Sequence, residues 1–235
     1  MVNIDVRPEV PQRFPEFSCH ALLVFFPKNL KISSAKLDHL DQLINKAISS
    51  WPDPISELEA VSVWRRAFKM MGLKPTKTLS SVEALIKLAK KNRWKTGNTV
   101  VDIYNAFSII NAAPLGGYDI DSFVEPTITV RNAMQSKDIF FPLGGDSEKY
   151  KLTSDVVVYA QGCSVLCWGI NHKDSKVFSI KESSRNLLFV SEGISDLHAD
   201  ISVNTLCQLK EFMKELGADC SEVSSIFGRG HIVVK

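Results

Sequence analysis

The sequence predicts one α+β domain, with helices mainly in the first half of the chain and a sheet mainly in the second. Apolar residues recur at spacings of three and four between residues 33 and 113, whereas they alternate or run together in short segments after residue 119. No repeat or low-complexity linker divides the 235 residues. Residues 1–16, with three prolines among alternating charges, are predicted to be an extended arm, and residues 17–235 the domain.

The first half begins with a buried strand and continues with helices that have recognisable ends. Residues 19–26 form an apolar run that Pro27 ends. Ser33 or Ser34, Ser56 and Ser80 are predicted helix N-caps, the last two with a glutamate three residues later. The predicted helices occupy residues 33–50, 56–71 and 80–89, and a fourth lies in the segment 97–119, where Pro114 ends it.

The second half reads as strands separated by turns. A helix interrupts them near the C-terminus, where apolar residues from Val203 to Leu216 share one face and Gly217 ends the helix. The predicted strands are residues 127–131, 139–143, 155–160, 164–170, 186–194 and 226–234.

Composition excludes several classes of protein. With 45% hydrophobic and 23% charged residues, the chain is neither disordered nor fibrous, and a net charge of +2 gives no argument for binding nucleic acid through bulk charge. The N-terminus has no secretory pattern, so we expect a cytoplasmic protein with its five cysteines reduced. No zinc-ligand set and no familiar catalytic motif occurs, and we expect neither a metal nor an organic cofactor.

The segment 97–119 combines a polar helix face with a flexible bend. Asn98, Asp102 and Asn105 stand at i, i+4 and i+7, so they share one face of the predicted helix. The double glycine at 116–117 follows, and it allows a close approach of the backbone before Tyr118 and Asp119. This pattern indicates the wall of a binding site. The alternative is that the polar side chains bond a neighbouring loop.

Two other segments are candidates for function. The end of the third helix carries Lys90, Lys91, Arg93 and Lys95 around Trp94, which indicates either an RNA-binding patch with a stacking ring or cations that stabilise a helix C-terminus. The segment 171–175 contains Asn171, His172 and Asp174 at a predicted turn between strands, where polar residues are also expected without a function.

Several blocks of the sequence resemble the stand-alone B3/B4 domain proteins. These proteins are similar to the editing and tRNA-contacting module in the β subunit of bacterial phenylalanyl-tRNA synthetase. The resemblance spans roughly residues 14–216 and implies a layered fold of β-sheet and helices. Its leading blocks are residues 63–68, 80–85, 98–105 and 114–119, followed in order by 130–133, 141–144 and 167–192.

The resemblance implies a site that clears tyrosine wrongly attached to the phenylalanine tRNA. It places Asn98, Asp102 and Asn105 on the pocket helix, residues 114–119 in the pocket turn, and Asp174 nearest to the position of a glutamate in a later loop. Gly116 stands where the synthetase motif has a histidine. Hydrolysis of an aminoacyl ester then depends on other groups.

We therefore assign provisional roles to these residues. The backbone amides of Gly116 and Gly117 are candidate oxyanion donors, Asp174 or His172 orients water, and the remaining candidates bind the substrate. The substrate-binding candidates are Asn98, Asp102, Asn105, Tyr118, Asp119 and Asn171.

Two functions remain open. One is trans-editing of misacylated tRNA, and the other is non-catalytic binding of RNA or of an amino-acid-like small molecule, which the absence of the histidine favours. Both require the polar helix face, the double glycine and the turn at 171–175 to meet around one cavity. A protein-interaction domain is a third possibility, for which the N-terminal arm is the only indication.

Overall fold

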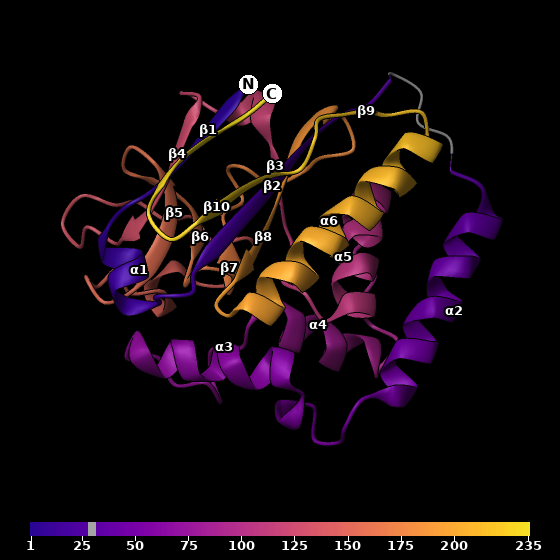
Figure 1. Ribbon diagram of the computed structural model, residues 1–235, viewed down its shortest axis with the longest axis horizontal. Coiled ribbons are helices and arrows are strands. Elements are labelled where there is room, and N and C mark those ends of the chain that lie inside the picture. Colours follow the sequence, from indigo (N-terminus) through magenta and orange to yellow (C-terminus); the bar gives the residue numbers. More distant parts are fainter. Residues whose placement is uncertain (28–31) are drawn as a thin grey trace.

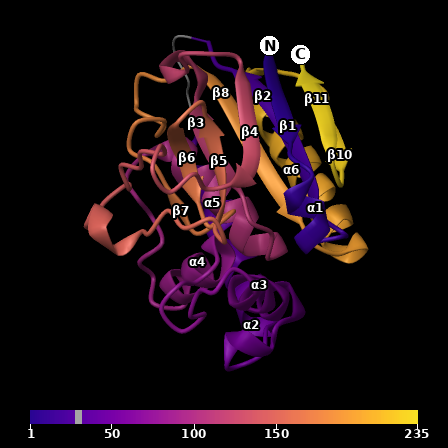
Figure 2. The ribbon, with the colours of Figure 1, turned by 90° about the vertical axis from the view of Figure 1, so that its left-hand side faces the viewer.

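Two β-sheets form the centre of the molecule, and the helices gather beside and below them (Figures 1 and 2). The computed structural model describes residues 1–27 and 32–235. Within these residues the α-helices are α1 Glu9–Arg13, α2 Ser34–Ser50, α3 Glu59–Met70, α4 Ser81–Ala89, α5 Thr99–Asn111 and α6 Asp196–Glu215. Short 3₁₀ helices are η1 Ile55–Glu57, η2 Ile120–Ser122 and η3 Ser147–Lys149. The prediction of an α+β fold is confirmed.

The strands divide into a six-stranded and a five-stranded sheet. They are β1 Val2–Val6, β2 Ser18–Phe25, β3 Gly116–Asp119, β4 Thr127–Asn132, β5 Val157–Gln161, β6 Ser164–Trp168, β7 Lys173–Asp174, β8 Asn186–Gly193, β9 Asp219–Cys220, β10 Ser224–Phe227 and β11 Gly230–Val234. The first sheet has the order β11-β1-β4-β5-β6-β7 and the second has the order β10-β2-β8-β3, with β9 paired to one end of β2. Only the β1–β4 pair is parallel in these described strands.

Most predicted helices agree with the structure because their caps are local. The Ser33 hydroxyl accepts a hydrogen bond from the backbone of Lys36, and Ser80 accepts one from Glu83. The start of α3 differs, since its N-cap is Leu58 without a side-chain cap, and Ser56 belongs to η1. α6 packs on β2 and β8, and α5 lies between α6, α4 and α2 (Figure 1).

The N-terminal segment is part of the first sheet. Val2, Ile4 and Val6 are at most 2% exposed, and β1 lies between β11 and β4. The expectation that residues 1–16 contain no regular element is therefore wrong. The alternating apolar residues decide the conformation of residues 2–6, while the three prolines fall at the N-cap of the short helix α1, inside it and just after it.

Two strand predictions fail at residues that cannot continue a ladder. Residues 139–143 form only isolated bridges at Ile139 and Pro142, and proline has no amide hydrogen to donate. Residues 226–234 do not form one strand, because Gly228 and Gly230 take positive φ angles of 71° and 147°. The resulting hairpin places β10 in the second sheet and β11 in the first.

The large core contains aromatic side chains from both sheets and from α3. The largest fully buried side chains include Trp64, Phe68, Tyr159 and Phe189. A second, smaller apolar cluster surrounds Phe140, Val158 and Trp168, which means that β5 is covered on both faces. No helix among the described residues has the length and apolar character needed to cross a membrane.

Stability of this fold should depend on a buried ion pair beside β4. Asp138 accepts hydrogen bonds from both terminal nitrogens of Arg131, at 2.8 and 2.7 Å, and from the Met134 amide at 2.7 Å. Because Arg131 is buried, Asp138→Ala leaves its charge without a partner, and we expect a loss of about 3–5 kcal/mol in the free energy of unfolding, measured by urea denaturation.

The matched control is Glu211→Gln, which removes an exposed ion pair with Lys214. That pair, with 3.3 Å between Nζ and Oε1, should contribute less than about 1 kcal/mol. Equal losses for the two variants would contradict the importance given to the buried pair.

Candidate functional site

A hydrogen bond joins the free edges of the two sheets. Tyr118 on β3 donates its hydroxyl to Oδ1 of Asp174 on β7, with 3.0 Å between the oxygens. β3 is the last strand of the second sheet and β7 the last of the first. The segment with the double glycine and the turn at 171–175 therefore do converge.

A second carboxyl group lies close to this bond. Glu192 on β8 is 3% exposed and is the register partner of Cys19 on β2, whose sulfur accepts the hydroxyl of Tyr159 at 3.6 Å. We call Tyr118, Tyr159, Asn171, Asp174 and Glu192 the carboxyl cluster. It is drawn from β3, β5, β7, β8 and the turn that precedes β7.

Burial controls the charge of this cluster. It raises the pKa of Glu192 to about 8, and the nearby Asp174 adds to the increase, while the hydroxyl of Tyr159 and the amide of Asn171 act against it. Burial also raises the pKa of Asp174, which Tyr118 and Cys167 oppose by hydrogen bonding. Glu192 is therefore mostly protonated at pH 7, and the two carboxyl groups do not both carry full charge.

The turn before β7 holds polar atoms that the protein leaves without partners. No atom of the Asn171 side-chain amide has a hydrogen bond of good geometry within the described chain, although the amide lies near enough to Glu192 to lower its pKa, and Oε2 of Glu192 is likewise unpaired. The backbone N–H of Asn171 donates to the Gly169 carbonyl at 2.7 Å, which gives a γ-turn with Ile170 at a φ of 62°. A positive φ is unfavourable for a β-branched residue, so both strain and unpaired polar groups accumulate at this turn.

The double glycine is required by close contacts. A Cβ atom at Gly116 would lie 2.9 Å from the Tyr118 hydroxyl, and one at Gly117 would lie 2.8 Å from a ring carbon of Tyr104. The predicted bend at these residues is wrong, because they begin strand β3. Tyr118 also occupies the space into which a side chain at position 116 would extend.

Strand geometry separates the two glycine amides. The Asp119 amide donates away from β8, to the carbonyl of Phe178 at 3.0 Å. Amides two residues apart on a strand point the same way, so the Gly117 amide also points away from β8 and the Gly116 amide points toward it. Of the two predicted oxyanion donors, only Gly117 is directed out of the ladder.

The polar face of α5 does not act as one row. Asn98 is the N-cap, where its side-chain oxygen accepts the amides of Val100 and Val101, and Asp102 accepts hydrogen bonds from the backbone and hydroxyl of Thr96. These local bonds account for Asn98 and Asp102 without a ligand. Asn105 is 7% exposed, and among the described residues no hydrogen bond to its side chain occurs.

Asp119 and Asn98 instead hold the segment that leads from β7 to β8. Asp119 accepts the hydroxyl of Ser184, and the Asn98 amide donates to the Ile180 carbonyl at 3.4 Å. Both predicted substrate-binding residues therefore support the segment that follows Asp174.

His172 lies apart from the carboxyl cluster. Its ring contacts Phe68, Tyr150 and Trp168, and its Nδ1 bonds the Leu79 carbonyl. It lines a cleft of about 840 Å³ whose wall contains none of the five cluster residues. The geometry thus gives no support to a shared role for His172 and Asp174.

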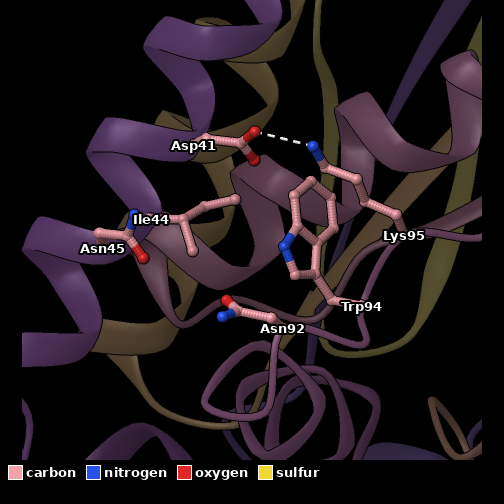
Figure 3. A pocket seen from close by; sticks show the side chains of 6 residues that line it. All are labelled: Asp41, Ile44, Asn45, Asn92, Trp94 and Lys95. Atoms are coloured by element: carbon pink, nitrogen blue, oxygen red, sulfur yellow. Dashed lines mark hydrogen bonds and ion pairs between the residues drawn. The ribbon is translucent and has the colours of Figure 1, made fainter.

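The predicted RNA-binding patch is partly engaged within the protein. Figure 3 shows Lys95 bonded to Asp41 across a pocket of about 280 Å³, with 2.7 Å between the charged atoms, and Trp94 is only 8% exposed. Lys90 pairs with Asp53 at 3.4 Å. Lys91 and Arg93 stay exposed, so the described patch offers two cations without a carboxylate partner and no exposed stacking ring.

Sequence reasoning missed Glu192, Tyr159 and Tyr104. Tyr104 on α5 contacts the double glycine. Burial raises the pKa of the Tyr104 hydroxyl, and the nearby Asp174 raises it further. The sequence did contain a signal for Glu192, which lies just after the apolar run 187–190. A carboxylate in a strand that is predicted to be buried requires an explanation.

The raised pKa of Glu192 predicts a pH-dependent stability. Between its ordinary pKa near 4.5 and the folded value of about 8, the folded protein keeps a proton that the unfolded chain releases. Stability should therefore fall as the pH rises through this window, by on the order of a few kcal/mol. A glutamine at position 192 cannot titrate. In Glu192→Gln, the urea midpoint relative to that of the wild type should therefore rise from pH 5 to pH 8.5. A difference that stays constant over this range would contradict the assignment.

The chain was compared with known proteins. It matches the family model of the B3/4 domain over residues 63–206, which is more than half of its length. A solved structure of an N-terminal fragment of the phenylalanyl-tRNA synthetase β-subunit from Pyrococcus horikoshii has a TM-score of 0.44 and 14% identity, with 97% of this chain and 55% of that chain covered, so this chain spans about half of that fragment. The search of curated proteins found no match. The chain belongs to the B3/4 domain family.

Proposed function

We propose that this protein binds the aminoacylated 3′ end of a tRNA and hydrolyses its ester, with the aminoacyl group held at the carboxyl cluster. Family membership and the sequence resemblance to the synthetase editing module support the choice of ligand. The observation that carries the proposal is the pair formed by Asn171 and Glu192. Their buried and unpaired polar atoms are costly in a folded protein unless a ligand bonds to them.

The cluster is suited to an amino acid that carries a hydroxyl group. A protonated Glu192 donates one hydrogen bond and accepts another, and the Asn171 amide supplies both a donor and an acceptor. A tyrosyl hydroxyl would satisfy these atoms, whereas a phenyl ring would leave them unpaired. Such a site rejects the ligand without the hydroxyl by large factors.

The same groups support hydrolysis. Asp174 is half-buried and is held in place by Tyr118, so its carboxylate can take a proton from an attacking water. The water oxygen bonds to the ester carbonyl carbon, and the bond from that carbon to the ribose oxygen breaks. The proton passes to the departing ribose oxygen, which becomes a hydroxyl group, and the products are the free amino acid and the tRNA. The Gly117 amide is the candidate donor to the developing oxyanion.

The second candidate function is binding without cleavage. It is favoured by Gly116, because a glycine supplies no imidazole, and by the hydroxyl of Tyr118, which fills the adjacent space. In this case the unpaired atoms of Asn171 and Glu192 recognise an amino-acid-like group and no bond is broken.

A deacylation assay distinguishes the two functions. With tyrosine attached to the phenylalanine tRNA as substrate, the wild type should release tyrosine, and both Glu192→Gln and Asp174→Asn should slow this release by roughly 100-fold or more. The assay is repeated with other mischarged tRNAs, in which tyrosine, isoleucine or alanine is attached to a tRNA of another amino acid.

The matched control is Glu16→Gln, an exposed site that should react at the wild-type rate. Binding of the charged tRNA is measured in parallel by filter retention. Binding without tyrosine release selects the non-catalytic module. Release at equal rates by the wild type and both cluster variants would remove the cluster from the mechanism.

A further inference from the structure

The largest described cleft lies beside the turn that carries Asn171, on the side of the turn away from the carboxyl cluster. It has a volume of about 840 Å³, within the range of roughly 300–1,000 Å³ that small-molecule sites occupy. Its walls come from the segment after α3, from η3 and the segment that follows it, and from the end of β6 with the turn after it. The lining includes Lys74, Lys77, Lys149, Tyr150, Lys151 and His172.

The rim of this cleft carries an excess of positive charge. Its four lysines are exposed, and none of them forms an ion pair with another described residue. Two acids also line the cleft, but Asp155 already pairs with Arg13 at 3.7 Å, which leaves Glu148 as the opposing charge. This excess is local, because the whole chain has a net charge of only +2. The rim is therefore complementary to an anion.

The wall of the cleft is aromatic. The Tyr150 ring lies 5.4 Å from Trp168 and 5.9 Å from His172, and Trp168 lies 5.4 Å from His172, measured between centroids. Trp168 is buried and donates to the Lys151 carbonyl at 3.0 Å, so it fixes the other two rings. Tyr150 and His172 are half-buried and present ring surface to the cleft.

His172 also offers a defined hydrogen-bonding atom. Burial lowers its pKa below the ordinary value of 6.5, so the ring is neutral at pH 7. Because Nδ1 faces the carbonyl oxygen of Leu79, the hydrogen lies on Nδ1 and Nε2 is an acceptor. An exocyclic amino group of a nucleobase is a donor of the matching kind.

We propose that this cleft binds a nucleoside phosphate, with the phosphate among the four lysines and the base against Tyr150 and His172. Cations combined with ring surface are the features that bind a single nucleotide. A free mononucleotide and a nucleotide within an RNA strand have this chemistry in common. The site goes beyond the proposed function, since it requires neither the carboxyl cluster nor an acyl ester.

Calorimetric titration of the full chain with AMP, adenosine and inorganic phosphate tests the composite site. AMP should bind at least roughly tenfold more tightly than either fragment, because only AMP engages both the rim and the wall. Phosphate that binds as tightly as AMP would overturn the proposal in favour of a simple anion site, and absence of AMP binding would overturn it outright.

Charge reversal locates the site. The double variant Lys77→Glu and Lys149→Glu should weaken AMP binding by roughly tenfold or more and should reduce its salt dependence. The matched control is Lys46→Glu with Arg229→Glu, which makes the same change in net charge at exposed residues that do not line the cleft. Loss of binding in the control alone would overturn the assignment to this cleft.

A comparison of ligands identifies the source of the nucleotide. A single-stranded RNA ending in CCA that binds more tightly than AMP, and loses that advantage in the Lys77 and Lys149 variant, indicates a nucleotide of an RNA strand. AMP that binds as tightly as the RNA indicates a free nucleotide. Either result is independent of the deacylation assay, so the two proposals fail separately.

Discussion

The placement of two carboxyl groups between the sheets, one buried at Glu192 and one half-buried at Asp174, is the constraint on which the rest of the site depends. Asp174 and Glu192 have no cationic partner among the described ion pairs, unlike the buried Asp138 and Glu83. Protonation makes the burial of Glu192 tolerable, and the hydroxyl groups of Tyr159 and Tyr118 stabilise Glu192 and Asp174, respectively. Apolar side chains at these positions would pack without that cost, so the carboxyl groups are better explained by function than by stability.

The sequence predicts those elements whose signals are local. Helix α4 follows from Ser80 and from apolar residues at helical spacing, and α6 ends at Glu215, just before Gly217 takes a positive φ angle. Strand β1 was missed because its partners, residues 127–130 and 230–234, lie more than 100 residues away in sequence. Pairing over such a distance leaves no trace in the local pattern beyond the alternation of Val2, Ile4 and Val6.

The same distinction applies to the site. The turn at 171–175 and the segment from Gly116 to Asp119 were identified from their composition, and the Tyr118–Asp174 bond brings them together. Asn98 and Asp102 carry equally polar signals, but both stand near the start of α5, where unpaired backbone amides recruit side-chain oxygens. Local sequence cannot separate a capping residue from a ligand-binding one, because both need the same atoms in the same place.

The turn from Gly169 to Asp174 connects the two proposed sites by its geometry. Gly169 and Ile170 both have positive φ angles, and the sharp reversal places Asn171 beside Glu192 and His172 in the aromatic wall of the cleft. An unfavourable backbone at Ile170 costs about 1–3 kcal/mol, and the unpaired amide of Asn171 adds a separate cost. Two independent penalties at adjacent residues do not stabilise the fold. They are explained if the turn is held open so that each of its faces can meet a ligand.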